Sequence, residues 1–217
     1  MRKLVPVALA YDFDGTLADT MQDLFLAWKR AFEDFEIEIK KEDYFPLEGM
    51  KLSEIAKTIS KKYNLSADSL KILELKERYY LEKYSFSLYP GVLNLISSLK
   101  NREVKIAIVS ASPLEKLVKT APEEFLFKFD VIISGNDTRE GKPSPEPYLM
   151  AMKKLNVLPK ECIVVENAPL GIKSAKTAGA YCIAVTTTLG KEFLQEADKI
   201  IPEIRDLEKN LFENSPQ

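Results

Sequence analysis

The chain has 217 residues, 46% of them hydrophobic, and a formal net charge of −2. This length suits one large domain or one domain with a smaller insert, and the apolar content argues against disorder. A slightly negative chain has no general attraction for nucleic acid or anionic membranes, so we expect neither as a partner. The absence of histidine excludes Ser-His or Cys-His nucleophile pairs and histidine-bound metals, which leaves chemistry to carboxylates, lysines and hydroxyls.

The N-terminal stretch MRKLVPVALAY combines a basic start with an apolar run, as a signal peptide does. The run has the shortest acceptable length, however, and Asp12 follows it directly. We therefore predict a buried first strand over residues 4–13. No run in the sequence approaches the ~20 apolar residues of a membrane helix, so we expect a cytoplasmic protein. Cys162 and Cys182 each lie in an apolar run and are predicted to be buried free thiols.

The segment after this first strand shows helical patterns only. Apolar stripes predict helices near residues 21–35, 52–59 and 67–84. The stretch LYPGV at 88–92 then turns the chain into a further helix that ends near Lys100. We predict that residues 20–87 form a helical cap domain inserted after the first strand. Residues 1–19 and 88–217 would form the core domain.

The rest of the chain alternates between short apolar runs and helical patterns. The predicted strands after the first are residues 105–110, 129–134, 162–166, 181–186 and, as a candidate sixth strand, 199–201. These runs are nearly continuous in Val, Ile, Ala and Leu, which is typical of strands buried on both faces. One helix between them is closed by Gly179 at a natural C-cap position. The alternation predicts an α/β fold with a doubly wound, Rossmann-like parallel sheet.

Polar side chains follow four of the predicted strands. They are Asp12 and Asp14 after the first strand, Ser110 after the second, Lys142 in the loop after the third, and Glu166 with Asn167 after the fourth. In open parallel sheets, ligands bind at the carboxyl ends of the strands. The sequence therefore predicts one polar site at that edge of the sheet.

Each of these residues also has an ordinary structural interpretation. Asp12 and Ser110 could cap helices, and Asp14 could begin a turn. Lys142 could be a solvated surface lysine, and Asn167 could cap the helix that follows it. Together these interpretations require a suitable polar residue at four strand ends by coincidence. We therefore favour the functional interpretation.

Four segments, in chain order, resemble the motifs of the haloacid dehalogenase-like hydrolase superfamily. They are DFDGTLADT, IVSAS, GKPSPEPY and VVENAPLGIKSAKTAG. The resemblance covers nearly the whole chain. The insert after the first motif is similar to the helical cap of the subgroup that includes phosphoglycolate phosphatases and β-phosphoglucomutases. The DGT sequence at 14–16 matches the phosphoryl-transfer version of the first motif rather than the dehalogenase version.

The resemblance implies roles for these residues in phosphoryl transfer from a small phosphorylated metabolite. Asp12 would attack phosphorus and form an aspartyl-phosphate, while Asp14 would protonate the leaving alcohol and then activate water. Ser110 and the backbone N–H of Ala111 would hold the transferred phosphate, and Lys142 would neutralise its charge. The implied enzyme is a Mg²⁺-dependent phosphatase.

The resemblance also implies a magnesium site made of Asp12, Asp14, Glu166 and Asn167. The family usually has an aspartate where this chain has Asn167. An amide oxygen can still coordinate a hard cation, but the site loses one negative charge. Two alternative functions stay open. One is a sugar-phosphate mutase of the β-phosphoglucomutase type, and the other is a binding protein of the same fold with an impaired metal site.

The sequence predicts no particular substrate, because specificity would come from the helical insert. The stretch PLEGMKLSEI at 46–55 is the best candidate for a loop that reaches the site, with Glu48 and Lys51 as polar contacts. A surface helix start is an equally good interpretation of this stretch. The resemblance favours a phosphatase over a mutase, because the family's mutases often carry an apolar residue in place of Thr16 and an arginine in this loop. We expect a monomer by default.

Overall fold

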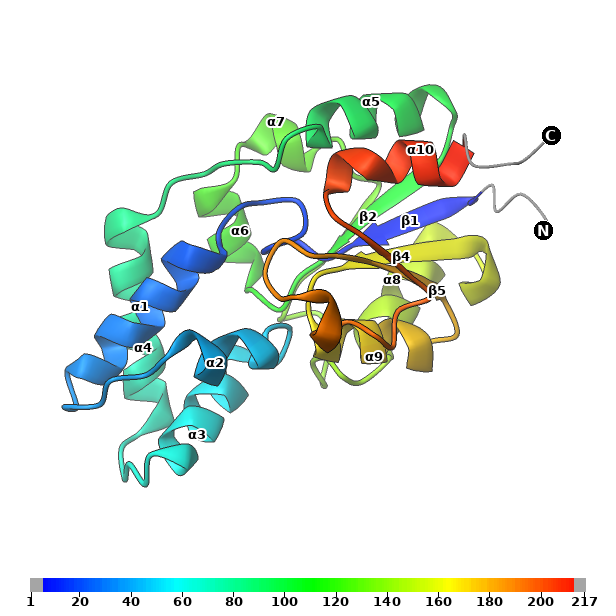
Figure 1. Cartoon of the computed structure of the whole chain (residues 1–217). Helices are drawn as coiled ribbons and strands as arrows, with labels where there is room; N and C mark the ends of the chain where they lie inside the picture. Colours follow the sequence, from blue (N-terminus) through cyan, green and yellow to red (C-terminus); the bar gives the residue numbers. More distant parts are fainter. Residues whose placement is uncertain (1–5, 213–217) are drawn as a thin grey trace.

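A six-stranded parallel sheet forms the centre of the larger part of the molecule in the computed structural model, which describes residues 6–212 (Figure 1). The strands are β1 (Ala8–Tyr11), β2 (Lys105–Val109), β3 (Val131–Ile133), β4 (Cys162–Glu166), β5 (Tyr181–Val185) and β6 (Lys199–Ile201). Their order is β3-β2-β1-β4-β5-β6, and every neighbouring pair is parallel. The strand order reverses between β1 and β4, which is the usual place for a ligand site. The predicted α/β, Rossmann-like fold is confirmed.

Helices cover both faces of this sheet (Figure 1). They are α5 (Val92–Asn101), α6 (Leu114–Thr120), α7 (Glu123–Leu126), α8 (Glu146–Leu155), α9 (Pro169–Thr177) and α10 (Leu207–Phe212), with single 3₁₀ turns at Pro159–Glu161, Lys191–Phe193 and Ile204–Asp206. Leu9 and Tyr11 of β1 pack into a cluster with α5, while Ala8 and Ala10 pack into a second cluster with α8 and α9. Alternate residues of each strand are therefore buried on opposite faces, which explains the continuous apolar runs.

The cap segment contains four helices and lies to one side of the sheet (Figure 1). They are α1 (Met21–Glu33), α2 (Lys41–Tyr44), α3 (Leu52–Lys62) and α4 (Ser69–Lys83), with a 3₁₀ turn at Phe45–Leu47. Their apolar side chains form a separate cluster around the buried Trp28. Where the segment joins the core, Ala18 forms an isolated bridge with Leu88. Both observations agree with a cap that covers residues 20–87. These boundaries stay a prediction.

Strand ends differ from the predicted ones because turns begin earlier than the apolar runs suggest. β1 ends at Tyr11 rather than Phe13, since the Phe13 carbonyl accepts backbone N–H groups from residues 16–18 and closes a turn. Residues 4 and 5 of the predicted first strand lie outside the described residues. β3 is shortened to Val131–Ile133. The short helices α2, α7 and α10 were not predicted, because four to six residues show no readable helical period.

Three smaller predictions can be compared directly with the structure. Cys162 and Cys182 are free and buried, as predicted. Gly179 follows α9 with a φ of 82°, the left-handed conformation that ends many helices and favours glycine. Between residues 6 and 212, no helix has both the length and the apolar character needed to span a bilayer.

Candidate active site

The ends of β1, β2 and β4 lie at the same level because of the sheet register. Tyr11, the last residue of β1, is paired with Ile108 on one side and Val165 on the other. Asp12 and Glu166, each one residue further along, are therefore at adjacent strand ends. The Nζ atom of Lys142 donates hydrogen bonds of 2.6 Å to both Asp12 Oδ1 and Glu166 Oε1. The structure thus brings these three predicted residues together.

Lys142 is a buried cation between two buried carboxylates. Burial alone would lower the pKa of Lys142, but the charges of Asp12 and Glu166 raise it above its usual value. The ammonium group is therefore charged at neutral pH. Burial raises the pKa of Asp12, while Lys142 acts in the opposite direction. Oδ2 of Asp12 is buried and accepts no hydrogen bond from the described residues, so this oxygen is the one available to a ligand.

Asp14 is held by two hydroxyl groups. Thr20 Oγ1 donates to Asp14 Oδ1 at 2.6 Å, and Ser112 Oγ donates to Asp14 Oδ2 at 3.3 Å. One bond comes from the start of the cap and the other from the loop after β2. The turn between Asp12 and Thr20 requires Gly15, whose φ is 82° and whose missing side chain leaves room for Asn167. The carboxyl of Asp14 is therefore fixed in one orientation.

Ser110 and Ala111 lie just past the end of β2. Ser110 Oγ accepts the backbone N–H of Ser112 at 3.1 Å, which curls the loop at the strand end. Helix α6 begins only at Leu114, with Pro113 as its N-cap, so Ser110 is not a helix cap. Ser110, Ala111 and Lys142 line a small cavity of about 10 Å³, about the volume that one water occupies.

Asn167 is fully buried and its side chain faces the first motif. Its Oδ1 accepts a 3.2 Å hydrogen bond from Thr16 Oγ1, and its Nδ2 donates a 2.7 Å bond to Thr188 Oγ1. The interpretation of Asn167 as a helix cap is wrong, because the N-cap of α9 is Ala168 and no side chain caps this helix. Asn167 precedes the N-cap by one residue, and its side chain is hydrogen-bonded to Thr16 of the first motif instead.

Glu166 uses both carboxylate oxygens inside the protein. Oε1 accepts hydrogen bonds from Lys142 and, at 2.5 Å, from the hydroxyl of Tyr148, while Oε2 accepts the backbone N–H of Asn167 at 3.1 Å. Gly171 on α9 lies so close that any Cβ there would overlap with this carboxylate. Glu166 is therefore a tightly packed acid whose charge is paired with Lys142.

The predicted magnesium site can be tested against these contacts. Among residues 6–212, no three carboxylates or thiols are grouped as a preformed cation cage. The donors at the strand ends are all oxygens, as a hard cation requires. Within the part of the chain that the structure describes, Asp12 Oδ2 accepts no hydrogen bond and Asn167 Oδ1 accepts one, from Thr16. The residues therefore fit an ion of the Mg²⁺ type, which usually takes few protein ligands and completes its shell with water and substrate phosphate.

The predicted cap loop does reach this edge of the sheet. Gly49, with a φ of 90°, packs so closely on Lys142 that an added Cβ would lie 2.8 Å from the lysine Cδ. Glu48 is buried beside it and accepts a 2.5 Å hydrogen bond from the hydroxyl of Tyr44. Burial and the charge of Asp14 raise the pKa of Glu48. Lys51 instead donates to the Thr138 carbonyl at 2.6 Å, so it fastens the loop to the core.

Sequence reasoning missed several residues that hold the site together. Thr20, Ser112 and Tyr148 orient the acids, and each is the last residue of one of the quoted segments. These three residues therefore lie within the motifs, but no local sequence rule identifies their hydroxyl groups as hydrogen-bond partners of the acids. Lys76 of α4 and Lys116 of α6 are also buried next to the site. Nothing in their sequence context distinguishes them from ordinary surface lysines.

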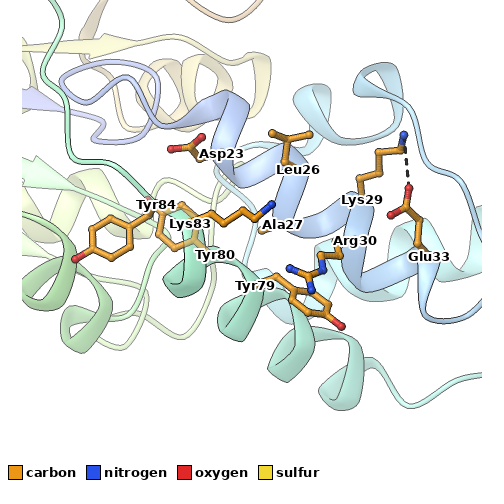
Figure 2. Close-up of a pocket in the computed structure, with 10 residues that line it drawn as sticks. All are labelled: Asp23, Leu26, Ala27, Lys29, Arg30, Glu33, Tyr79, Tyr80, Lys83 and Tyr84. Carbon is orange, nitrogen blue, oxygen red and sulfur yellow. Dashed lines mark ion pairs between the residues drawn. The ribbon is translucent and has the colours of Figure 1, made fainter.

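A separate depression lies on the outer face of the cap, between α1 and α4 (Figure 2). Its volume is about 380 Å³, and Figure 2 shows Tyr79 and Tyr80 of α4 beside Ala27 and Arg30 of α1. Arg30 stacks on the Tyr79 ring at 4.0 Å and pairs with Glu82 at 3.0 Å. None of the predicted site residues lines this groove.

Comparisons with known proteins agree with the resemblance in the motifs. A family model described as haloacid dehalogenase-like hydrolase matches residues 9–185. The chain is 28% identical over 199 residues to the phosphorylated carbohydrates phosphatase of Thermotoga maritima, and this match covers 87% of the chain and 90% of that protein. The crystal structure of β-phosphoglucomutase from Clostridium difficile superposes with a TM-score of 0.81 at 27% identity, covering 93% of each chain.

One relative is much longer than this chain. The Arabidopsis thaliana protein SUPPRESSOR OF QUENCHING 1, chloroplastic, is 32% identical over 206 residues, which are 88% of this chain but 19% of that protein. The family model spans all four motifs and both sides of the cap. The chain therefore belongs to the haloacid dehalogenase-like hydrolase family, as its motifs predict.

Proposed function

We propose that this protein is a Mg²⁺-dependent phosphatase that hydrolyses a small phosphorylated metabolite through an aspartyl-phosphate. The observation that carries the proposal is the state of Asp12. Lys142 donates to its Oδ1 at 2.6 Å, while its buried Oδ2 has no hydrogen-bond partner among residues 6–212. A carboxylate fixed by one oxygen and free at the other is well placed for nucleophilic attack. The family and the named phosphatases among the relatives support a phosphoric monoester hydrolase.

The first step forms a bond between a carboxylate oxygen of Asp12 and phosphorus and breaks the ester P–O bond. The proton of Asp14 passes to the leaving alcohol oxygen, so that no alkoxide is released. Thr20 and Ser112 keep the Asp14 carboxyl in place for this transfer. Ser110 and the N–H of Ala111 would hold the phosphate oxygens, and Lys142 would offset their charge.

The second step releases phosphate from the enzyme. Asp14, now ionised, takes a proton from water, the water oxygen bonds to phosphorus, and the bond to Asp12 breaks. Asp12, Asp14 and Asn167 would hold Mg²⁺, with Glu166 beside them, and the ion would neutralise phosphate charge when bound. Glu166 has a further role in holding Lys142 at 2.6 Å.

A sugar-phosphate mutase is the second candidate, because β-phosphoglucomutase is among the structural neighbours. Two features favour the phosphatase. The loop at 46–55 has no arginine, and Thr16 occupies the position after Asp-Gly. In the structure Thr16 donates to Asn167 Oδ1, which places a hydroxyl beside the proposed metal ligand. A monomeric state and a cytoplasmic location stay predictions.

The test measures phosphate release from p-nitrophenyl phosphate with Mg²⁺ and after chelation by EDTA, followed by a panel of phosphorylated sugars and acids. We expect turnover that requires Mg²⁺. With β-glucose 1-phosphate and a trace of the bisphosphate, free phosphate should form faster than glucose 6-phosphate. Faster glucose 6-phosphate formation would identify a mutase. No release from any ester would identify a binding protein with an impaired metal site.

A further inference from the structure

The side chain of Asn167 has two ends of nearly equal size and different chemistry. The amide oxygen can coordinate a hard cation, whereas the amide nitrogen only donates hydrogen bonds. Hydrogen bonds rather than packing therefore decide which end of the amide faces which neighbour. An aspartate would present an oxygen at either end. An asparagine in a metal site thus depends on neighbours that hold its amide in one orientation.

Two threonine hydroxyl groups contact the two ends of this amide. Thr16 Oγ1 donates to Asn167 Oδ1 at 3.2 Å, and Asn167 Nδ2 donates to Thr188 Oγ1 at the shorter distance of 2.7 Å. Thr16 belongs to the first motif, together with Asp12 and Asp14, while Thr188 lies in the loop after β5. The oxygen end of the amide therefore contacts the motif that carries the two aspartates, and the nitrogen end contacts the β5 loop.

The β5 loop is fastened to the first motif at the point where it meets the amide. An added Cβ on Gly15 would overlap with Asn167 Nδ2 and would lie 2.7 Å from Thr188 Oγ1. The amide nitrogen and the threonine hydroxyl thus both pack on the bare Cα of Gly15. Thr187, the residue before Thr188, donates its hydroxyl to the Gly15 carbonyl. Asn167 is fully buried, so bulk water does not replace the Thr188 hydroxyl.

We infer that Thr188 is a positioning residue for the metal site, because its hydroxyl holds the nitrogen end of Asn167 and so keeps Oδ1 at the first motif. This inference rests on the proposed Mg²⁺-dependent function. It explains how an asparagine serves where the family usually has an aspartate. Without the Thr188 hydroxyl, the buried N–H groups lose their acceptor. The amide then turns over so that Nδ2 donates to Thr16 Oγ1, and the oxygen is withdrawn from the ion.

Calorimetric titration with Mg²⁺ tests this role without turnover. Thr188→Val removes the hydroxyl with little change of shape, and Thr188→Ser keeps it. Thr186→Val is the control, because it removes a hydroxyl of the same loop that donates to the Pro202 carbonyl at 3.3 Å. Each Mg²⁺ dissociation constant is compared with that of wild type.

The dissociation constant should rise by about fivefold or more in Thr188→Val, since the apparent affinity falls with the fraction of protein in the competent orientation. Thr188→Ser and Thr186→Val should match wild type. An unchanged dissociation constant in Thr188→Val would overturn the inference and leave the proposed function intact. An equal rise in Thr186→Val would also overturn it, because the loop as a whole would then be responsible.

The same exchange in the Asn167→Asp background separates positioning from support of the loop. A carboxylate presents an oxygen at both ends, so its orientation no longer matters. Thr188→Val should therefore not weaken Mg²⁺ binding in this background, and the two substitutions should be non-additive. An equal rise of the dissociation constant in both backgrounds would contradict the inference.

NMR measures the orientation of the amide with neither Mg²⁺ nor substrate. The side-chain NH₂ signals of Asn167 are identified by their absence in Asn167→Asp. In wild type these protons should show nuclear Overhauser effects to the side chain of Thr188, and in Thr188→Val to that of Thr16. Effects mainly to Thr16 in wild type would overturn the inference alone. If wild type binds no Mg²⁺ in the calorimeter, the metal site of the proposed function is rejected, and this inference with it.

Discussion

Lys142 and Lys116 are both buried lysines beside the same site, but the protein treats their charges differently. Lys142 has two carboxylates at 2.6 Å, whereas Lys116 has a hydroxyl and an aromatic ring. The charge of Lys142 on the core side is thus paired within the protein. On the cap side, Lys116 has no carboxylate within ion-pair distance among the described residues and interacts with Glu48 and Glu77 over longer distances. The difference shows that the core-side lysine is held by direct ion pairs, whereas Lys116 on the cap side is held by a hydroxyl, a ring and more distant charges.

The largest expected effect comes from removing the nucleophile on the core side. Asp12→Asn should abolish turnover of p-nitrophenyl phosphate, because an amide does not attack phosphorus. Asp19→Asn changes an exposed acid of the same motif and should keep wild-type activity. Circular dichroism checks that both variants are folded. A turnover of one tenth of wild type or more in Asp12→Asn, with deamidation excluded by mass spectrometry, would contradict the mechanism.

The second prediction concerns stability and separates the two lysines. Lys142→Met leaves Asp12 and Glu166 buried without their cation, so the free energy of unfolding should fall by about 3–5 kcal/mol. Lys116→Met removes a buried charge that has no ion pair within the described part of the chain and only longer-range interactions with Glu48 and Glu77, so it should lose much less stability. Urea unfolding measures both, with the exposed Lys154→Met as control. Equal losses of unfolding free energy in Lys142→Met and Lys116→Met would contradict the proposed difference between the two lysines.

The third prediction uses the pH dependence of stability on the cap side. Burial and, next, the charge of Lys116 lower the pKa of Lys76 to about 8. Between pH 8 and the ordinary lysine pKa of about 10.4, the unfolded chain binds a proton that the folded protein has lost. The penalty for burying this charge is therefore fully present below pH 8 and disappears as the pH rises. Its size is about 3 kcal/mol, since each pKa unit corresponds to about 1.4 kcal/mol.

The variant Lys76→Met should accordingly be more stable than wild type near neutral pH, and this advantage should vanish by about pH 10.4. Lys83→Met, an exposed lysine on the same helix, should show no such trend. Glu77, Lys116 and Asp14 all influence Lys76, so the measurement is repeated in Glu77→Gln. A stability difference independent of pH in Lys76→Met would show that Lys76 titrates normally.

The sequence predicts the core side of this comparison better than the cap side. Parallel strands place their carboxyl ends at one edge, so the meeting of Asp12 and Glu166 follows from the neighbouring positions of β1 and β4, while Lys142 reaches them from the loop after β3. The apolar stripes of α1 and α3 likewise follow from helical period. The burial of Lys76 and Lys116 has no such local cause. It arises only when α4 packs against α1 and Tyr80 covers α6, and sequence spacing does not determine that contact.

Asn167 provides the smallest effect and the finest test of the core side. Its Oδ1 accepts from Thr16 and its Nδ2 donates to Thr188. In Asn167→Asp the first bond is kept, and the Thr188 hydroxyl can turn to donate in place of the lost amide. The substitution therefore adds one negative charge with little change of packing. Two unit charges ~4 Å apart at an effective dielectric of 20 interact by about 4 kcal/mol, and desolvation leaves only a fraction of this for binding.

If Asn167 lies in the magnesium site, half-saturation by Mg²⁺ should fall by about tenfold in Asn167→Asp, which corresponds to ~1.4 kcal/mol. Glu166→Gln should raise it, because one negative charge is removed from the same strand end. Asn136→Asp adds the same charge on an exposed loop and controls for net charge. Mg²⁺ titrations of phosphatase rate and calorimetric Mg²⁺ titrations provide independent readouts. Unchanged half-saturation in both Asn167→Asp and Glu166→Gln would leave this pair a structural role only, with Glu166 as the anchor of Lys142 and Asn167 as the link between the first and last motifs.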